Sequence, residues 1–175
     1  MSRIALLTDD QASESVRPKL EAVRRGLGTV PNLVRVFARS EAALDGYLAF
    51  SGALGKGSLP AKLREQIALV VAETNGCEYC LAAHSFLGGR VGLDRQAIAA
   101  ARDGHAEDTK TDVALAFARE VAAGRGRASD DTLSKAIRAG WSEGELVEIV
   151  AHVALNVLTN FTNNVAHTPV DFPAP

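Results

Sequence analysis

The 175-residue sequence is poor in aromatic residues, in cysteine and in long apolar runs. Aromatic side chains make up only 5% of the chain, and the apolar residues recur at spacings of three and four, which favours helices over strands. No stretch approaches the roughly 18 apolar residues that span a bilayer. The N-terminus, MSRIALLTDDQ, has an apolar run too short for a signal peptide. We therefore expect a cytoplasmic protein with no membrane partner.

The chain also lacks a strong excess of charge of one sign. Its net charge is -2 and its pI is near 6.1, so no concentrated positive field is available for a phosphate backbone or an anionic surface. This argues against nucleic acid as a partner. The length suits one domain spanning residues 1–175, because chains of this size bury a sufficient core without splitting.

Helix start and stop signals divide the chain into nine predicted helices, so the expected fold class is all-α. Ser142 with Glu145 fits a capping box, and Gly140 fits the stop of the preceding helix. The tail TPVDFPAP contains prolines that prevent a helix, so it should run extended along the surface. The predicted helices cover residues 14–27, a short segment opened by Pro31, 40–54, 58–74, 77–88, 94–102, 111–123, 129–139 and 142–166.

The two cysteines lie together in NGCEYCLAAHS, residues 75–85. Gly76 ends one helix, which places Cys77 at the N-cap of the next helix and Cys80 in its first turn. His84 follows one turn later, and the three side chains fall within an arc of roughly 60° on one helix face. A reducing compartment disfavours a structural disulfide, so this pair is reactive, metal-bound or incidental.

The preceding predicted helix carries two candidate bases, Glu65 and Glu73. Helical projection places Glu73 on a polar stripe, whereas Glu65 falls on a stripe of alanines and should be partly buried. Desolvation disfavours the charged form of a carboxylate, which suits such a group to accept a proton near neutral pH. Glu65 is therefore the preferred base.

These residues resemble the AhpD-like, carboxymuconolactone decarboxylase superfamily of alkylhydroperoxidase-related proteins. The resemblance rests on Glu65, Cys77, Cys80 and His84 in REQIALVVAETNGCEYCLAAHS. It extends to EIVAHVALNVLTNFTNNVAHTPVDFP, which is similar to the last helix and tail of the peroxidase-related branch. Glutamate, CxxC and histidine in a helical context are a far more specific pattern than CxxC alone.

The resemblance implies a thiol-dependent peroxidase in which Glu65 is the base, His84 the proton relay, Cys80 the attacking thiolate and Cys77 the resolving thiol. It implies no cofactor and no metal. The implied partners are a hydroperoxide substrate, an external dithiol reductant of the lipoylated or thioredoxin-like kind, and peroxiredoxins. It also implies a homotrimer or homohexamer.

The order of the two cysteines and the residue between them bear on this assignment. Exposure and the helix dipole alone favour Cys77 as the nucleophile, because it lies nearest the helix start. The resemblance assigns that role to Cys80, which lies one turn from His84, and leaves Cys77 outermost, where it would meet a reductant. Some AhpD proteins carry a histidine where this chain has Tyr79, which predicts weak peroxidase activity because tyrosine does not exchange protons easily at neutral pH.

Other functions remain open on the sequence. A disulfide oxidoreductase with little peroxidase activity would use the same pair, whereas a lactone decarboxylase would need no redox pair. A zinc-stabilised, non-enzymatic helical module would use both cysteines and His84, with a fourth ligand from His105, His152 or His167. Plain buried thiols are the remaining alternative.

The last predicted helix carries two further patterns. A polar stripe is either solvated or lines the cysteine pocket or a subunit interface; it comprises Glu145, His152, Asn156, Thr159 and Asn163. An apolar ridge is long enough that one small domain would leave part of it uncovered; it comprises Leu146, Ile149, Val150, Val153 and Val157. We expect the ridge to favour oligomerisation, and we expect His105 and Trp141 to be structural.

Overall fold

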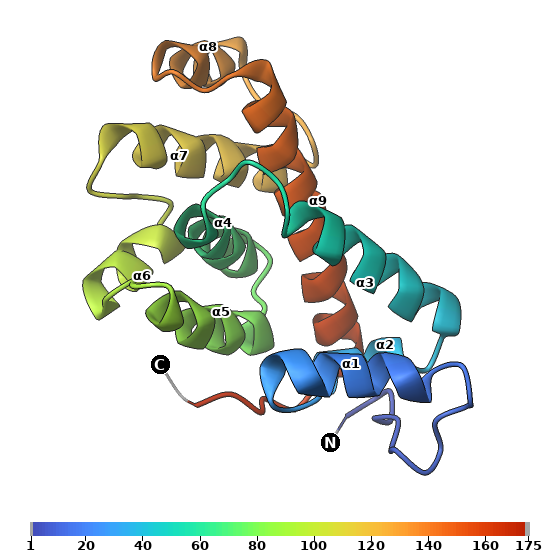
Figure 1. The fold of residues 1–175 in the computed structure, drawn as a ribbon. Helices are drawn as coiled ribbons and strands as arrows, with labels where there is room; N and C mark the ends of the chain where they lie inside the picture. Colours follow the sequence, from blue (N-terminus) through green and yellow to red (C-terminus); the bar gives the residue numbers. More distant parts are fainter. Residues whose placement is uncertain (1, 174–175) are drawn as a thin grey trace.

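The computed structural model describes residues 2–173, and this part of the chain contains nine α-helices and no strand, so the predicted all-α fold class is confirmed (Figure 1). The helices are α1 (Arg17–Leu27), α2 (Asn32–Phe37), α3 (Glu41–Leu54), α4 (Ala61–Thr74), α5 (Glu78–Arg90), α6 (Arg95–Arg102), α7 (Thr109–Ala123), α8 (Asp130–Arg138) and α9 (Glu143–Ala166). Among the described residues, no helix combines the length and apolar character that crossing a membrane requires.

Most of these helices begin where a side chain caps the first turn. Ser142 accepts a hydrogen bond from the backbone N–H of Glu145, whose carboxylate accepts one from the Ser142 backbone N–H, so the predicted capping box is confirmed. Gly140 has a φ of 87°, which only glycine adopts freely, and it follows the end of α8. Outside the cysteine site, four further helices begin at a side-chain cap: Ser40, Asp94, Asp108 and Ser129.

Several predicted boundaries were wrong, and long-range contacts explain one of them. α4 begins at Ala61 instead of residue 58, because the Glu148 carboxylate on α9 accepts hydrogen bonds from the backbone N–H groups of Ser58 and Leu59. These bonds hold the segment before α4 as a loop. α1 begins at Arg17, α5 continues to Arg90, and α7 begins at Thr109 because Asp108 is its cap.

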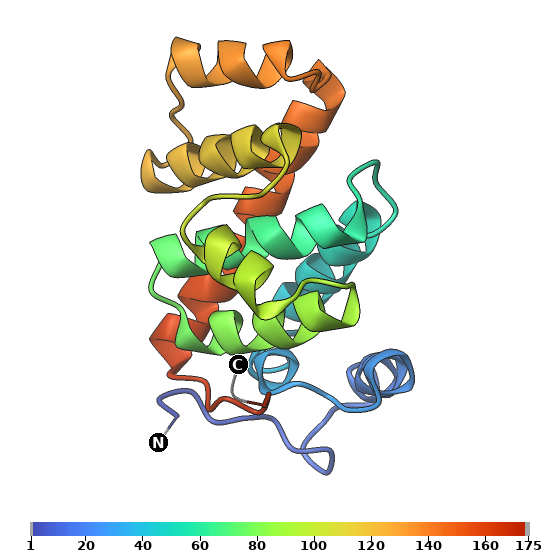
Figure 2. The same cartoon turned by 90° about the vertical axis from the view of Figure 1, so that its left-hand side faces the viewer.

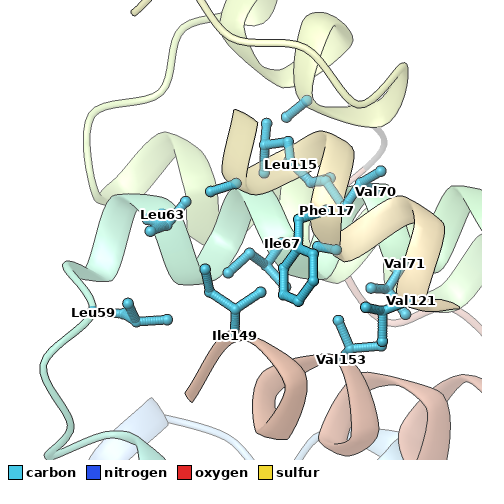
Figure 3. Close-up of a cluster of buried hydrophobic side chains, with 14 of the residues drawn as sticks. Leu59, Leu63, Ile67, Val70, Val71, Leu115, Phe117, Val121, Ile149 and Val153 are labelled. Atoms are coloured by element: carbon cyan, nitrogen blue, oxygen red, sulfur yellow. The ribbon is translucent and has the colours of Figure 1, made fainter. Parts of the chain in front are cut away.

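α4 lies at the centre of the fold. It packs against α5, α6, α7 and α9, and Figures 1 and 2 show α9 running the length of the molecule beside it. Figure 3 shows the apolar core where α4, α7 and α9 meet, including Ile67, Leu115 and Ile149, which are fully buried. This core fixes the position of α4 relative to α9, and these two helices form two sides of the site described below.

The predicted apolar ridge on α9 proved to be mostly core. Leu146, Ile149 and Val153 are buried, and only Val150 is substantially exposed. The ridge is therefore left uncovered only in part, as expected: α4 and α7 cover the buried residues and Val150 stays exposed. Val150 and four further exposed side chains of α9 form a surface that we call the α9 apolar stripe: Val147, Val150, Leu158, Phe161 and Val165.

The N-terminal segment and the C-terminal tail lie at the same end of the molecule. The backbone N–H of Arg3 donates to the carbonyl of Ala166 at 2.7 Å, and the Asp171 carboxylate accepts a hydrogen bond from the Asn32 backbone N–H at 2.8 Å. Phe172 packs edge-on against Tyr79, with 5.7 Å between ring centroids. The tail is extended through residue 173, as predicted; its last two residues lie outside the described part.

Candidate functional site

The cysteine pair begins α5. Gly76, with a φ of 61°, turns the chain, and Cys77 follows as the N-cap, its Sγ accepting a hydrogen bond from the Cys80 backbone N–H at 3.3 Å. The two cysteines lie at disulfide-bonding distance, with Cα atoms 5.3 Å apart. Both sulfur atoms therefore lie at the positive end of the helix dipole, where a thiolate is stabilised.

Both cysteines are buried, but only Cys80 faces a pocket. Cys77 is fully buried and Cys80 is 2% exposed. Cys77 is covered by an apolar cluster formed mainly by the first 44 residues, including Val34 and Leu44. The expectation that Cys77 is outermost was therefore wrong, because the N-terminal segment packs over it.

The pocket has a volume of about 240 Å³, which suits a small molecule. Five helices contribute to its wall: α2, α3, α4, α5 and α9. About half of the lining side chains are polar or charged, and the rest are apolar or aromatic. The lining includes Leu33, Tyr47, Arg64, Glu65, Tyr79, Cys80, His84, His152, Asn156, Thr159 and Asn163.

Glu65 and His84 form a direct pair in this pocket. His84 Nδ1 donates to Glu65 Oε2 at 2.7 Å, and their side chains are 23% and 20% exposed. The bond occupies one ring nitrogen and leaves Nε2 to exchange a proton, as in other carboxylate–histidine pairs. Glu73 is 42% exposed and is bonded to Arg102 on α6, away from the pocket. The structure thus agrees with the different burial expected for the two glutamates.

The polar stripe on α9 is buried and lines the pocket. His152, Asn156, Thr159 and Asn163 are each 6% exposed or less, whereas Glu145 lies apart in the capping box. Asn163 Nδ2 donates to Cys80 Sγ at 3.2 Å. Sequence reasoning named these residues but left their burial open, because a polar stripe of this kind is also typical of a solvated helix face.

His152 differs from His84 in having no close partner. Its Nε2 atom is buried without a hydrogen bond, and the nearest carboxylate oxygen, Glu148 Oε1, is 4.0 Å away. Burial lowers the pKa of His152, and the positive charge of Arg64 lowers it further, outweighing the opposing effect of Glu148. His152 is therefore neutral at pH 7 and presents an uncharged imidazole to the pocket.

Tyr79, between the two cysteines, is also neutral. Its hydroxyl oxygen accepts a hydrogen bond from the Leu33 backbone N–H at 3.2 Å, and burial raises the pKa of Tyr79 far above its ordinary value. The side chain therefore serves to hold α2 against α5.

His105 and Trp141, which the sequence predicts to be structural, lie outside the pocket. His105 lies exposed beside Asp112, at 3.1 Å, and Trp141 Nε1 donates to the carbonyl of Lys110 at 3.0 Å. Within residues 2–173, no three or more His, Cys, Asp or Glu side chains are arranged to hold a metal ion. The zinc alternative therefore has no ligand set in this part of the chain.

The family comparison covers the segment that contains these residues. Residues 41–124 match the model of the carboxymuconolactone decarboxylase family. This match covers just under half of the chain and supports the resemblance to the AhpD-like carboxymuconolactone decarboxylase superfamily. Glu65, Cys77, Cys80 and His84 all lie inside the matched segment, so the family match includes the cysteine pair and the acid–base pair of the pocket. No curated protein matches the sequence.

Solved structures of similar fold include peroxidase-related proteins and a debrominase. A peroxidase-related protein from Silicibacter sp. TM1040 aligns with a TM-score of 0.84 and 22% identity, covering 95% of this chain and 90% of that one. A protein with an alkylhydroperoxidase AhpD core from Ralstonia eutropha JMP134 aligns with a TM-score of 0.88 and 20% identity, covering 97% and 92%. A variant of the debrominase Bmp8 bound to 2,3,4-tribromopyrrole aligns with a TM-score of 0.83 and 19% identity, covering 98% and 92%. These similarities establish the AhpD-like fold.

Proposed function

We propose that this chain is a thiol-dependent peroxidase of the alkylhydroperoxidase type. The observation that carries the proposal is a CxxC pair whose second cysteine faces a small pocket that also contains the hydrogen-bonded Glu65–His84 pair. A redox cysteine needs deprotonation and access to its substrate. In this pocket Cys80 has a nearby acid–base pair and an open side, whereas Cys77 has neither.

The reaction begins with Cys80 as the attacking group. Glu65 draws the proton of Cys80 through His84, and the thiolate attacks one peroxide oxygen. An S–O bond forms as the O–O bond breaks, and the leaving oxygen takes the proton back to depart as an alcohol or water. Cys80 is now a sulfenic acid, oxidised by two electrons, and the hydroperoxide has been reduced by two.

Cys77 completes the oxidative half of the cycle. Its thiolate attacks the Cys80 sulfur and displaces hydroxide, which leaves as water with one proton, so one disulfide and one water form per peroxide. The Cys80 backbone N–H that caps Cys77 Sγ stabilises this thiolate. The short Cα separation allows the bond to form without moving the start of α5.

An external dithiol, supplied by a lipoylated or thioredoxin-like protein, then reduces the disulfide. Because Cys77 is sealed beneath the N-terminal cluster, the reductant attacks Cys80 Sγ and Cys77 is the leaving thiolate. The capping N–H of α5 favours that leaving group. This assignment reverses the sequence-based expectation that Cys77 meets the reductant. Peroxiredoxins are the further partners implied by the superfamily.

The test compares Cys80→Ser with Cys77→Ser under an alkyl hydroperoxide and an excess of dithiol. Cys80→Ser should lose turnover completely. Without dithiol, Cys77→Ser should react once and leave a sulfenic acid on Cys80 that a dimedone probe labels. A monothiol added afterwards should form a mixed disulfide at Cys80 and release water. Turnover retained by Cys80→Ser would overturn the assignment.

A disulfide oxidoreductase with little peroxidase activity is the second candidate. The neutral, buried Tyr79 favours it, because this residue contributes no proton exchange where some relatives have histidine. Steady-state rates with a peroxide and with a small disulfide substrate separate the two functions. A peroxidase should consume peroxide much faster than it reduces the disulfide, and the reverse ratio would favour the second candidate.

A further inference from the structure

Among the polar residues of the α9 stripe, Asn163 makes a contact of a different kind. Asn156 Nδ2 donates to the His152 carbonyl and Thr159 Oγ1 donates to the Asn156 carbonyl, so both bond within their own helix. Asn163 Nδ2 instead crosses to α5 and donates to Cys80 Sγ at 3.2 Å, with the sulfur in its disulfide with Cys77. Asn163 is 3% exposed, and its Oδ1 atom is buried without a hydrogen-bond partner.

This contact is favourable mainly when the sulfur is charged. Burying an amide removes its hydrogen bonds to water, and a neutral sulfur is a weak acceptor that returns little of that loss. A thiolate is a charged acceptor, and hydrogen bonds to charged groups are roughly twice as strong as neutral ones. The Asn163 amide therefore distinguishes the thiolate of Cys80 from its thiol.

The neighbouring asparagines hold Asn163 in register with the cysteines. Asn75 Nδ2 donates to Asn160 Oδ1 at 2.9 Å, and Asn164 Nδ2 donates to the Asn75 carbonyl at 3.0 Å. Asn75 lies two residues before Cys77, in the turn that leads into α5. Bonds on both sides of Asn163 thus tie α9 to the turn that positions the cysteine pair.

The geometry points to Asn163 as the positioning residue that stabilises the Cys80 thiolate, with its amide N–H acting as a fixed donor to the sulfur. The inference rests on the proposed function in one respect, that Cys80 is the attacking cysteine. It assigns Asn163 a role that is separate from proton transfer: Glu65 and His84 move the proton, and Asn163 sets how readily the sulfur gives it up.

Other groups in the pocket also act on the Cys80 thiol, so the test must hold them constant. They are Tyr47 from α3, Arg64 and Glu65 from α4, Tyr79 and His84 from α5, His152 from α9, and the partner thiol Cys77. A Cys77→Ser background removes the second thiol and keeps the start of α5, because serine is a favoured N-cap residue. All further variants are made in that background.

The experiment measures the alkylation rate of the reduced Cys80 thiol by iodoacetamide as a function of pH. Asn163→Leu keeps the size of the side chain and removes the donor, so it should raise the pKa of the Cys80 thiol by about one unit and slow alkylation at pH 7 about tenfold. Asn163→Asp replaces the donor with a carboxylate and should raise the pKa of the Cys80 thiol further. At high pH the rates should converge with that of the parent protein, which loss of folding would not produce.

Asn156→Leu is the matched control, since it changes the same residue type on the same pocket wall but touches no sulfur. It should leave the midpoint of the pH profile in place, although a change in the pocket wall can alter the absolute rate of alkylation. A profile for Asn163→Leu that coincides with that of the parent would overturn the inference. If the Asn163 variants fail to fold, proton NMR of the unsubstituted protein decides: the Asn163 side-chain amide signals should titrate with Cys80, and signals that do not titrate would refute the contact.

These readouts separate this inference from the proposed peroxidase function. A shifted thiol profile with no peroxide turnover in the unsubstituted protein would support the role of Asn163 and reject the peroxidase. Normal peroxide turnover together with an unshifted thiol profile would support the peroxidase and reject the role of Asn163.

Discussion

At the scale of single residues, the two histidines of the pocket have opposite surroundings. His84 is bonded to a carboxylate, whereas His152 is buried without a close partner. The sequence predicted Glu65 and His84 from their spacing around the cysteines. It could not show that His152, Asn156 and Asn163 face the same pocket, because that depends on how α9 packs against α4 and α5.

The buried His152 should make the protein less stable in mild acid. Its pKa is lowered by burial, so the unfolded chain binds this proton more readily than the folded protein. At a pH above 6.5, the ordinary pKa of histidine, His152 is neutral in both the folded and the unfolded chain and costs no stability. As the pH falls from 6.5 through the lower pKa of the folded protein, the unfolded chain takes up the proton first and stability is lost. The free energy of unfolding in urea should therefore decline between pH 7 and pH 5, and His152→Gln should decline less.

The exposed His105 provides the control for that measurement. His105→Gln makes the same substitution at a side chain that is 69% exposed. If it flattens the pH dependence as much as His152→Gln does, burial of His152 is not the cause. Parallel pH profiles for His152→Gln and the unsubstituted protein would contradict the account of His152.

At the scale of helices, local signals predicted which segments form and tertiary contacts set the remaining boundaries. Caps such as Ser129 and Ser142 were readable because a cap needs only nearby backbone groups. The start of α4 could not be predicted from the sequence. It depends on a hydrogen bond from the Ser58 backbone N–H to the carboxylate of Glu148, which lies 90 residues further along the chain. The burial of Cys77 was missed for the same reason: the segment that covers it is distant in sequence.

The capping box of α9 should contribute measurably to stability. Ser142→Ala removes the side chain that accepts the Glu145 N–H and should lower the free energy of unfolding by about 1 kcal/mol. Ser142→Asp retains a capping oxygen and should stay close to the unsubstituted protein. Urea unfolding measures both changes. Equal losses for the two variants would mean that the cap is not the cause.

At the scale of the whole molecule, the α9 apolar stripe is the surface that the fold leaves uncovered. Phe161 is 55% exposed and Val165 is 62% exposed, on the helix that also lines the pocket. The expected homotrimer or homohexamer would bury such a surface. Sedimentation should therefore show self-association, and Phe161→Glu should weaken it by about tenfold or more, as loss of a central aromatic contact does.

Leu27→Glu is the control for this prediction, since Leu27 is similarly exposed but lies on α1, outside the α9 apolar stripe. It should leave the sedimentation of the protein unchanged. A monomeric unsubstituted protein, or equal effects of both substitutions, would show that the stripe is not the surface that drives association.

The most direct test of the account as a whole is the rate at which a hydroperoxide oxidises the reduced thiols at pH 7 in Glu65→Gln and Glu73→Gln. Glu65 is bonded to His84 in the pocket, whereas Glu73 is paired with Arg102 outside it. Glu65→Gln should slow oxidation about a hundredfold, the usual size of a general-base contribution, and Glu73→Gln should leave the rate unchanged. Equal rates for the two variants would contradict the claim that Glu65 and His84 serve the cysteine pair.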